Sequence, residues 1–180
     1  MKKILVFSLV VALVLVLLLP AVVVAKPAAT FSATGTITGI SPTVVGQKAF
    51  PLGQSGKWLV VNRDLTGVFA AGGSVAGAYT LTYGGVFDIS TQAGNLTGVL
   101  KNGDNQFFVN ARVNPLTFNS SGLPKLDITG HWLAISGVKA VGNFTAQLIF
   151  TTDTSGHITG VTGSFGMTGR YLNGNSDSAE

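Results

Sequence analysis

The chain has 180 residues and contains 24 glycines, no cysteine, and 11 lysines and arginines against seven aspartates and glutamates. Without cysteine, a small scaffold held by disulfides is excluded, so stability has to come from packing and backbone hydrogen bonds. The excess of positive charge is small, and two of the cations, Lys2 and Lys3, precede an apolar segment. We therefore expect no nucleic-acid partner.

The N-terminal segment predicts the compartment. Lys2 and Lys3 are followed by an apolar run over residues 4–19, and Pro20 then leads into Ala21-Val22-Val23-Val24-Ala25. This layout is typical of a secretory signal helix over residues 1–25, with cleavage after Ala25. Residues 4–25 are also long enough to remain as a membrane anchor, because about 20 apolar residues span a bilayer. Both interpretations place residues 26–180 outside the cytoplasm, either secreted or anchored to the outer face of the membrane.

Beyond residue 25 the dominant pattern has a period of two. Residues 30–38 alternate hydroxyl side chains with apolar residues or glycine, and residues 75–83 and 144–151 show a similar period of two with one mainly apolar face. Such a pattern puts each kind of side chain on its own face of a strand, as in a half-buried sheet. Asn102-Gly103-Asp104-Asn105 separates two further runs and predicts a tight hairpin turn.

One tripeptide, an apolar residue followed by Thr-Gly, occurs six times. The copies lie at residues 37–39, 65–67, 96–98, 128–130, 158–160 and 167–169. The first five begin 28 to 32 residues apart, which suits one long hairpin per repeat. We interpret the tripeptide as a strand end at which glycine bends the chain.

These patterns predict an all-β fold in one domain, residues 26–171. We expect a single antiparallel β-barrel of about eight to ten strands, because closure removes the exposed edges of a long meander. A two-sheet β-sandwich is the alternative. Residues 42–56 and 114–124 are rich in proline and glycine and predict longer connections, and residues 172–180 predict a polar, flexible tail.

Two similar pairs, Asp127 with His131 and Asp153 with His157, are the candidates for a metal site. Each histidine follows its aspartate by four residues. We expect Asp127 and His131 to lie along one strand, where positions four apart are separated by about 13 Å, which is too far for one ion. Asp153 instead caps a predicted hairpin turn. We therefore expect neither a metal nor another cofactor.

Catalytic patterns are sparse. Gly72-Gly73-Ser74-Val75-Ala76 lacks the second glycine of a nucleophile elbow. Asp88 lies between apolar neighbours, where a carboxyl group is either buried with a raised pKa or directed from the solvent face. We expect no enzyme; the alternative is an isomerase or cyclase working in a barrel cavity, with Asp88 or His131 facing that cavity.

Aromatic residues provide the candidate binding site. Trp58 and Trp132 occur in similar settings, Gly-Lys-Trp-Leu and Gly-His-Trp-Leu, and Tyr79 and Tyr83 share one face of a predicted strand. In a closed barrel, these four rings are expected to line a cavity or its mouth, where they suit a small apolar or amphipathic ligand. Ordinary core packing is the alternative for each ring.

The sequence thus favours a secreted or cell-surface, non-enzymatic β domain that binds a small apolar or amphipathic ligand. The main alternative is a self-associating surface-layer or matrix protein, in which a second copy of the chain is the partner. An outer-membrane barrel ranks third, because the chain lacks aromatic girdles and ends in a polar tail. Asn95, Asn119 and Asn143 lie in N-glycosylation sequons.

Overall fold

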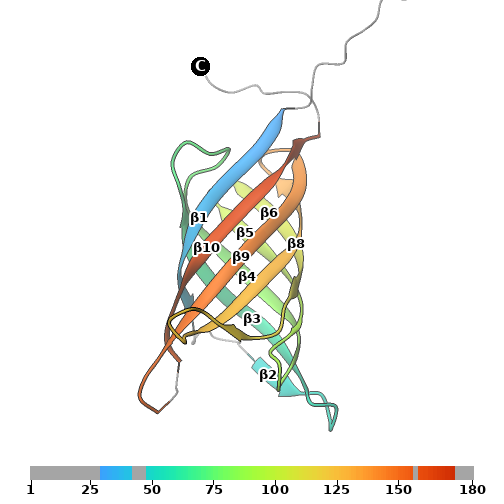
Figure 1. Ribbon diagram of the computed structural model, residues 1–180. Helices are drawn as coiled ribbons and strands as arrows, with labels where there is room; N and C mark the ends of the chain where they lie inside the picture. The colour runs from blue at the N-terminus through green and yellow to red at the C-terminus, as the bar shows by residue number, and fades with distance from the viewer. Residues whose placement is uncertain (1–28, 42–47, 156–157, 173–180) are drawn as a thin grey trace, which may run out of the picture.

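The computed structural model describes residues 29–41, 48–155 and 158–172, which form one antiparallel β-sheet with no helix (Figure 1). In chain order the strands are β1 (Thr30–Ser41), β2 (Lys48–Pro51), β3 (Lys57–Phe69), β4 (Gly77–Asp88), β5 (Gly94–Asn102), β6 (Asn105–Val113), β7 (Thr117–Phe118), β8 (Pro124–Ser136), β9 (Ala140–Thr152) and β10 (Ile158–Tyr171). The predicted signal helix, residues 1–25, and nearly all of the predicted tail lie outside the described residues.

The sheet closes into a barrel of eight strands. Its order is β1-β10-β9-β8-β6-β5-β4-β3, and a ladder between β1 and β3 joins the two edges, running from Gly35 opposite Phe69 to Ser41 opposite Asp64. The short strand β2 pairs with β3 beyond the end of the β1–β3 ladder, and the short strand β7 pairs with β8 off the main strand path. The predicted barrel is therefore confirmed. The two-sheet alternative is wrong, because the β1–β3 ladder leaves one continuous sheet instead of two separate ones.

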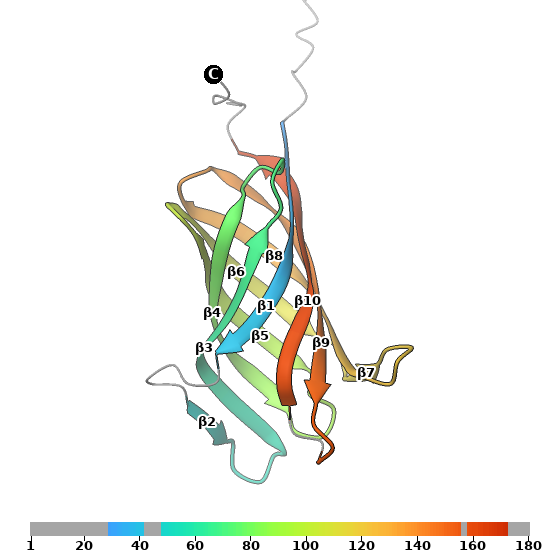
Figure 2. The ribbon, with the colours of Figure 1, turned by 90° about the vertical axis from the view of Figure 1, so that its left-hand side faces the viewer.

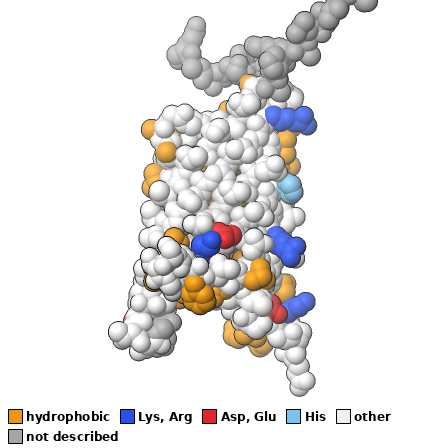
Figure 3. Space-filling model, in the orientation of Figure 1, with side chains coloured by type: hydrophobic (Ala, Val, Ile, Leu, Met, Phe, Trp, Pro, Cys, Tyr) orange, Lys and Arg blue, Asp and Glu red, His pale blue; other side chains and the backbone are white. Residues whose placement is uncertain are grey.

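Apolar side chains predominate inside the barrel, and hydroxyl side chains are common on its outer wall. On β1, Phe31, Ala33 and Ile37 are buried, whereas the hydroxyl residues between them are exposed. The same alternation places a single apolar core inside the ring. On the face shown in Figure 3, the surface is mostly uncharged and polar, and hydrophobic side chains gather toward the end that carries β2.

Aromatic rings fill one end of the barrel, which we call the filled end. Phe31, Phe107, Trp132 and Tyr171 pack together there, with the Phe31 centroid 4.6 Å from that of Trp132 and 5.9 Å from that of Phe107. Strand β1 begins and β10 ends at this end, where the backbone N–H of Tyr171 donates a hydrogen bond to the carbonyl oxygen of Ala29. Figure 2 shows these two strand ends side by side.

Glycine recurs at inward positions because a neighbouring ring or backbone occupies the space of a side chain. Gly67 lies opposite Tyr79, whose ring covers the place where a Cβ atom of residue 67 would lie. The Tyr79 hydroxyl donates a hydrogen bond to the carbonyl oxygen of Thr36 at 3.2 Å. Gly98 and Gly130 lie in the middle of β5 and β8, so our interpretation of the Thr-Gly tripeptide as a strand end is wrong for these copies.

Candidate ligand-binding cavity

A cavity of about 910 Å³ lies at the end of the barrel opposite the filled end. We call this end the open end. Strands β1, β2, β3, β4, β8, β9 and β10 contribute to its wall, together with the loop after β4. Most of the wall is apolar, and its apolar residues include Ile40, Val60, Phe87, Leu126, Phe150 and Val161. The filled end supplies a floor, so the barrel has the form of a cup.

A β-bulge in β3 shapes the cavity wall. Trp58 and Val60 pair with Phe87 and Gly85 and face the cavity, and the register between β3 and β4 then shifts before Arg63. Asn62 lies inside this irregularity with a φ of 52°, a left-handed conformation that asparagine tolerates better than most residues. Without the extra residue, simple alternation would place Arg63 on the opposite face from Trp58 and Val60. The bulge therefore puts the arginine inside the barrel.

Arg63 lies directly opposite Tyr83 in the ladder, and both line the cavity. Burial raises the pKa of the Tyr83 phenol, and the positive charge of Arg63 partly opposes this shift. The phenol is therefore neutral near pH 7 and can donate a hydrogen bond. An arginine and a tyrosine thus provide polar groups within a mainly apolar wall.

Asp88 also lines the cavity, but the loop between β4 and β5 engages its carboxylate. Its Oδ1 atom accepts hydrogen bonds from the Ser90 and Thr91 hydroxyls at 2.6 and 3.1 Å, and from both backbone N–H groups at 2.9 Å. These bonds, led by that from the Ser90 hydroxyl, hold the pKa of Asp88 at about 2. Of the two interpretations of Asp88, the buried carboxyl group with a raised pKa is therefore wrong, because the hydrogen bonds favour the ionised form.

The structure separates the four ring residues predicted to bind a ligand. Trp58 and Tyr83 line the cavity, and Trp58 is 38% exposed. Tyr79 and Trp132 are only 3% and 1% exposed and lie in the packed core. The Trp132 Nε1–H group donates a hydrogen bond to the carbonyl oxygen of Asn143 at 2.9 Å. Ligand binding by any of the four stays a prediction, but two of them reach the cavity and two do not.

Sequence reasoning missed Arg63 as a cavity residue. Its neighbours Asn62 and Asp64 are polar, so residues 62–64 look like a solvent-facing interruption of an apolar strand. The asparagine was the one available signal, because it is suited to the left-handed backbone of a bulge. That signal is weak without knowledge of the partner strand.

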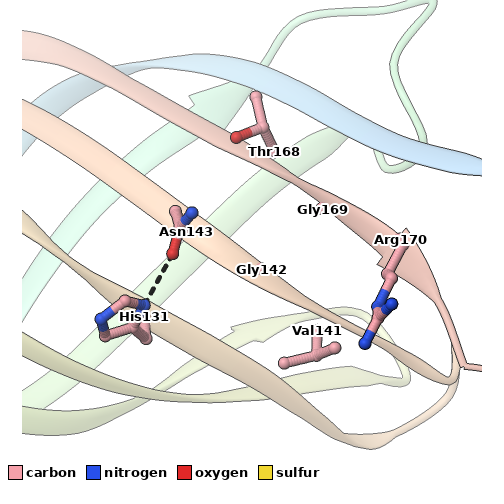
Figure 4. Close-up of a pocket in the computed structure, with 7 residues that line it drawn as sticks. All are labelled: His131, Val141, Gly142, Asn143, Thr168, Gly169 and Arg170. Carbon is pink, nitrogen blue, oxygen red and sulfur yellow. Dashed lines mark hydrogen bonds between the residues drawn. The ribbon is translucent and has the colours of Figure 1, made fainter.

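A second, shallower hollow of about 470 Å³ lies on the outer wall (Figure 4). His131 and Asn143 point toward one another there from neighbouring strands, with Nδ1 and Oδ1 2.6 Å apart, and Arg170 lies across the hollow. Glycines 142 and 169 contribute to its base. His131 therefore faces outward and does not face the cavity that the enzyme alternative requires.

The candidate metal ligands are not brought together. Asp127 lies on β8 with His131 and bonds instead to Lys125, at 2.9 Å, and to the side-chain amide of Gln147, at 3.0 Å. These contacts, led by that with Lys125, lower the pKa of Asp127. His157 lies outside the described residues. Across the described ranges, no three histidine or acidic residues form a group that could hold a metal ion.

Fold and cavity together define a class: a closed up-and-down β-barrel with one filled end and one open end that leads to a cavity. No protein-family model matches the chain, and the searches of curated proteins and of solved structures find no match. In the part of the chain that the structure describes, no helix is long and apolar enough to cross a membrane.

Proposed function

We propose that this protein is a secreted or surface-held, non-enzymatic barrel that binds a small apolar or amphipathic ligand in the cavity at its open end. The observation that carries the proposal is the cavity of about 910 Å³, a size within the range typical of small-molecule sites. Its mainly apolar wall with a few polar groups is also typical of such sites.

The polarity of the outer wall supports a barrel surrounded by water. Outward residues on β1 and β10 are mostly threonine and serine, and those on β8 and β9 include charged and amide side chains. A barrel embedded in lipid carries the reverse arrangement, with an apolar band outside. The enzyme alternative has less support, because Asp88 is engaged by its own loop and His131 lies on the outer wall.

Self-association is a second candidate, because one row of apolar side chains crosses the outer wall. Val99, Phe108, Leu133 and Val141 are successive cross-strand partners on β5, β6, β8 and β9. Phe108 and Leu133 are each 42% exposed. A contiguous exposed apolar surface favours contact with another protein surface.

Native mass spectrometry of the protein secreted by its own host tests both candidates. The ligand proposal expects a monomer with added mass that is lost under denaturing conditions. The denatured mass also reports whether residues 1–25 have been removed. Bare oligomers would favour self-association, and a bare monomer that binds no amphiphile would contradict the ligand proposal.

A matched pair of variants then locates the binding site. Val60 faces the cavity, whereas its neighbour Leu59 pairs with Val86 on the opposite face of the sheet. Val60→Trp fills the cavity and is expected to weaken ligand binding by about tenfold or more, while Leu59→Trp leaves it unchanged. Equal effects of the two variants would place the ligand outside the cavity.

A further inference from the structure

Arg63 is a charged side chain in a mainly apolar cavity. It is half-buried, and the wall around it includes Val60 and Phe87. A guanidinium group taken partly out of water is unfavourable unless a partner or hydrogen-bond acceptors compensate it. Its surroundings therefore determine what the cavity can hold.

Within the part of the chain that the structure describes, no acidic side chain pairs with Arg63. Among the described residues the single ion pair joins Lys125 to Asp127, and the Arg63 side chain makes no hydrogen bond. Asp64 follows it in the chain but accepts a hydrogen bond from the Thr82 hydroxyl at 2.6 Å on the outer face.

The remaining acidic groups near the cavity have other partners: Asp127 pairs with Lys125, and the Oδ1 atom of Asp153 accepts a hydrogen bond from the backbone N–H of Ser155 at 2.9 Å. The Oδ1 atom of Asp88 accepts four hydrogen bonds from its own loop. Residues 42–47, which connect two strands of the cavity wall, contain no aspartate or glutamate. The guanidinium therefore presents its donors to the cavity without a counter-ion from the described structure.

We infer that the ligand is an amphipathic carboxylate whose acidic group binds Arg63, with the Tyr83 hydroxyl as a second donor. This inference rests on the proposed ligand-binding function. Guanidinium groups match carboxylates in a two-pronged geometry, and such charge-assisted bonds are stronger than neutral ones. The neutral Tyr83 phenol, directly across the ladder, is suited to donate to the same carboxylate.

The layers of the barrel give the ligand an orientation. The next inward pair below Arg63 and Tyr83 is Leu65 with Leu81, which belongs to the buried core. On the other side, Trp58 lies toward the open end and is partly exposed. The carboxylate therefore enters first and reaches the cavity floor, and the apolar part of the ligand extends toward the mouth.

A pair of amphiphiles that share one chain but differ in the head group tests the inference. Binding of decanoate and of decanol to the full secreted protein is measured by titration calorimetry near neutral pH. We expect decanoate to bind about tenfold or more tightly than decanol. In Arg63→Met this preference disappears, because decanoate binding weakens while decanol binding is retained.

Three further variants separate the local role of Arg63 from general charge and folding effects. Arg112→Gln removes an exposed cation on β6 and is expected to leave the preference unchanged. Arg63→Lys keeps the charge but not the planar fork and is expected to retain part of the preference. Tyr83→Phe is expected to weaken decanoate binding selectively. Circular dichroism establishes whether each variant is folded. If Arg63→Met is unfolded, the test compares the preference of Arg63→Lys for decanoate over decanol with that of the wild type.

The outcomes distinguish the two proposals. Equal binding of decanoate and decanol to the wild type would overturn the carboxylate inference and leave the ligand-binding cavity in place. A preference that survives in Arg63→Met but is lost in Arg112→Gln would also overturn it. If neither amphiphile binds and the secreted protein carries no added mass, the proposed function itself fails.

Discussion

The two tryptophans, which look alike in the sequence, are expected to respond oppositely to substitution by phenylalanine. Trp132 is fully buried among Phe31 and Phe107 and donates a hydrogen bond through Nε1. Trp58 is 38% exposed at the open end. Trp132→Phe should therefore destabilise the fold, and Trp58→Phe should change ligand binding with little effect on stability.

The magnitude follows from what each substitution removes. In Trp132→Phe, the loss of one hydrogen bond costs about 1 kcal/mol, and the reduced apolar burial costs about as much again. The total of about 2 kcal/mol corresponds to a fall in Tm of about 4–8 °C for a domain of this size. Trp58→Phe should stay within about 0.5 kcal/mol of the wild type, as is usual for partly exposed positions.

Urea unfolding followed by far-ultraviolet circular dichroism is the suitable assay, because it does not depend on tryptophan emission. Fluorescence of the two variants adds a check: the spectrum that remains in Trp58→Phe should be the more blue-shifted, because it comes from the buried ring. Equal destabilisation by both substitutions would refute the assignment of one tryptophan to the filled end and the other to the cavity mouth.

Two further predictions concern the close contact between Gly67 and the Tyr79 ring and the carboxylate of Asp88. Gly67→Ala should destabilise the barrel by about 1–3 kcal/mol, because a Cβ atom there collides with the Tyr79 ring; an unchanged urea midpoint would contradict this. The folded pKa of Asp88, about 2, lies below its ordinary value, so its ionised form stabilises the fold at neutral pH, and this contribution is lost as the pH falls from about 4 to about 2. The stability of Asp88→Asn, measured by thermal unfolding, should depend less on pH across that window than that of the wild type, and parallel curves would argue against the role given to the loop.

Alternation of side chains predicted the inward and outward faces of the strands, because it is a local property of each segment. Phe31, Ala33 and Ile37 were placed on one face from their spacing alone, and they are buried. Closure of the barrel depends on the ladder between β1 and β3, which runs from Gly35 opposite Phe69 to Ser41 opposite Asp64 and so joins residues far apart in the chain. Neither segment alone specifies that pairing, so a sandwich remained an alternative at the level of sequence.

The candidate site was predicted only in part, because register decided which rings reach the cavity. Trp58 and Trp132 have similar neighbours in the chain, but they lie at opposite ends of their strands relative to the barrel axis. The bulge at Asn62 is what turns Arg63 inward, and its position depends on the pairing of β3 with β4. The hydroxyl residues that follow Asp88 are a local signal for a turn that engages its carboxylate, but we considered only burial or solvent exposure for that group.

The first barrel strand, β1, begins at the filled end, and the last, β10, ends there. The backbone N–H of Tyr171 donates a hydrogen bond to the carbonyl oxygen of Ala29 at this point. A tether, fusion partner or solid support joined through either end of the barrel therefore attaches at the end opposite the cavity (Figure 1). A barrel held at a membrane in this way would present the cavity to the surrounding medium, and the ligand that we propose would then arrive from solution. The same geometry allows the proposed binding to be tested on immobilised protein, because the point of attachment and the cavity lie at opposite ends.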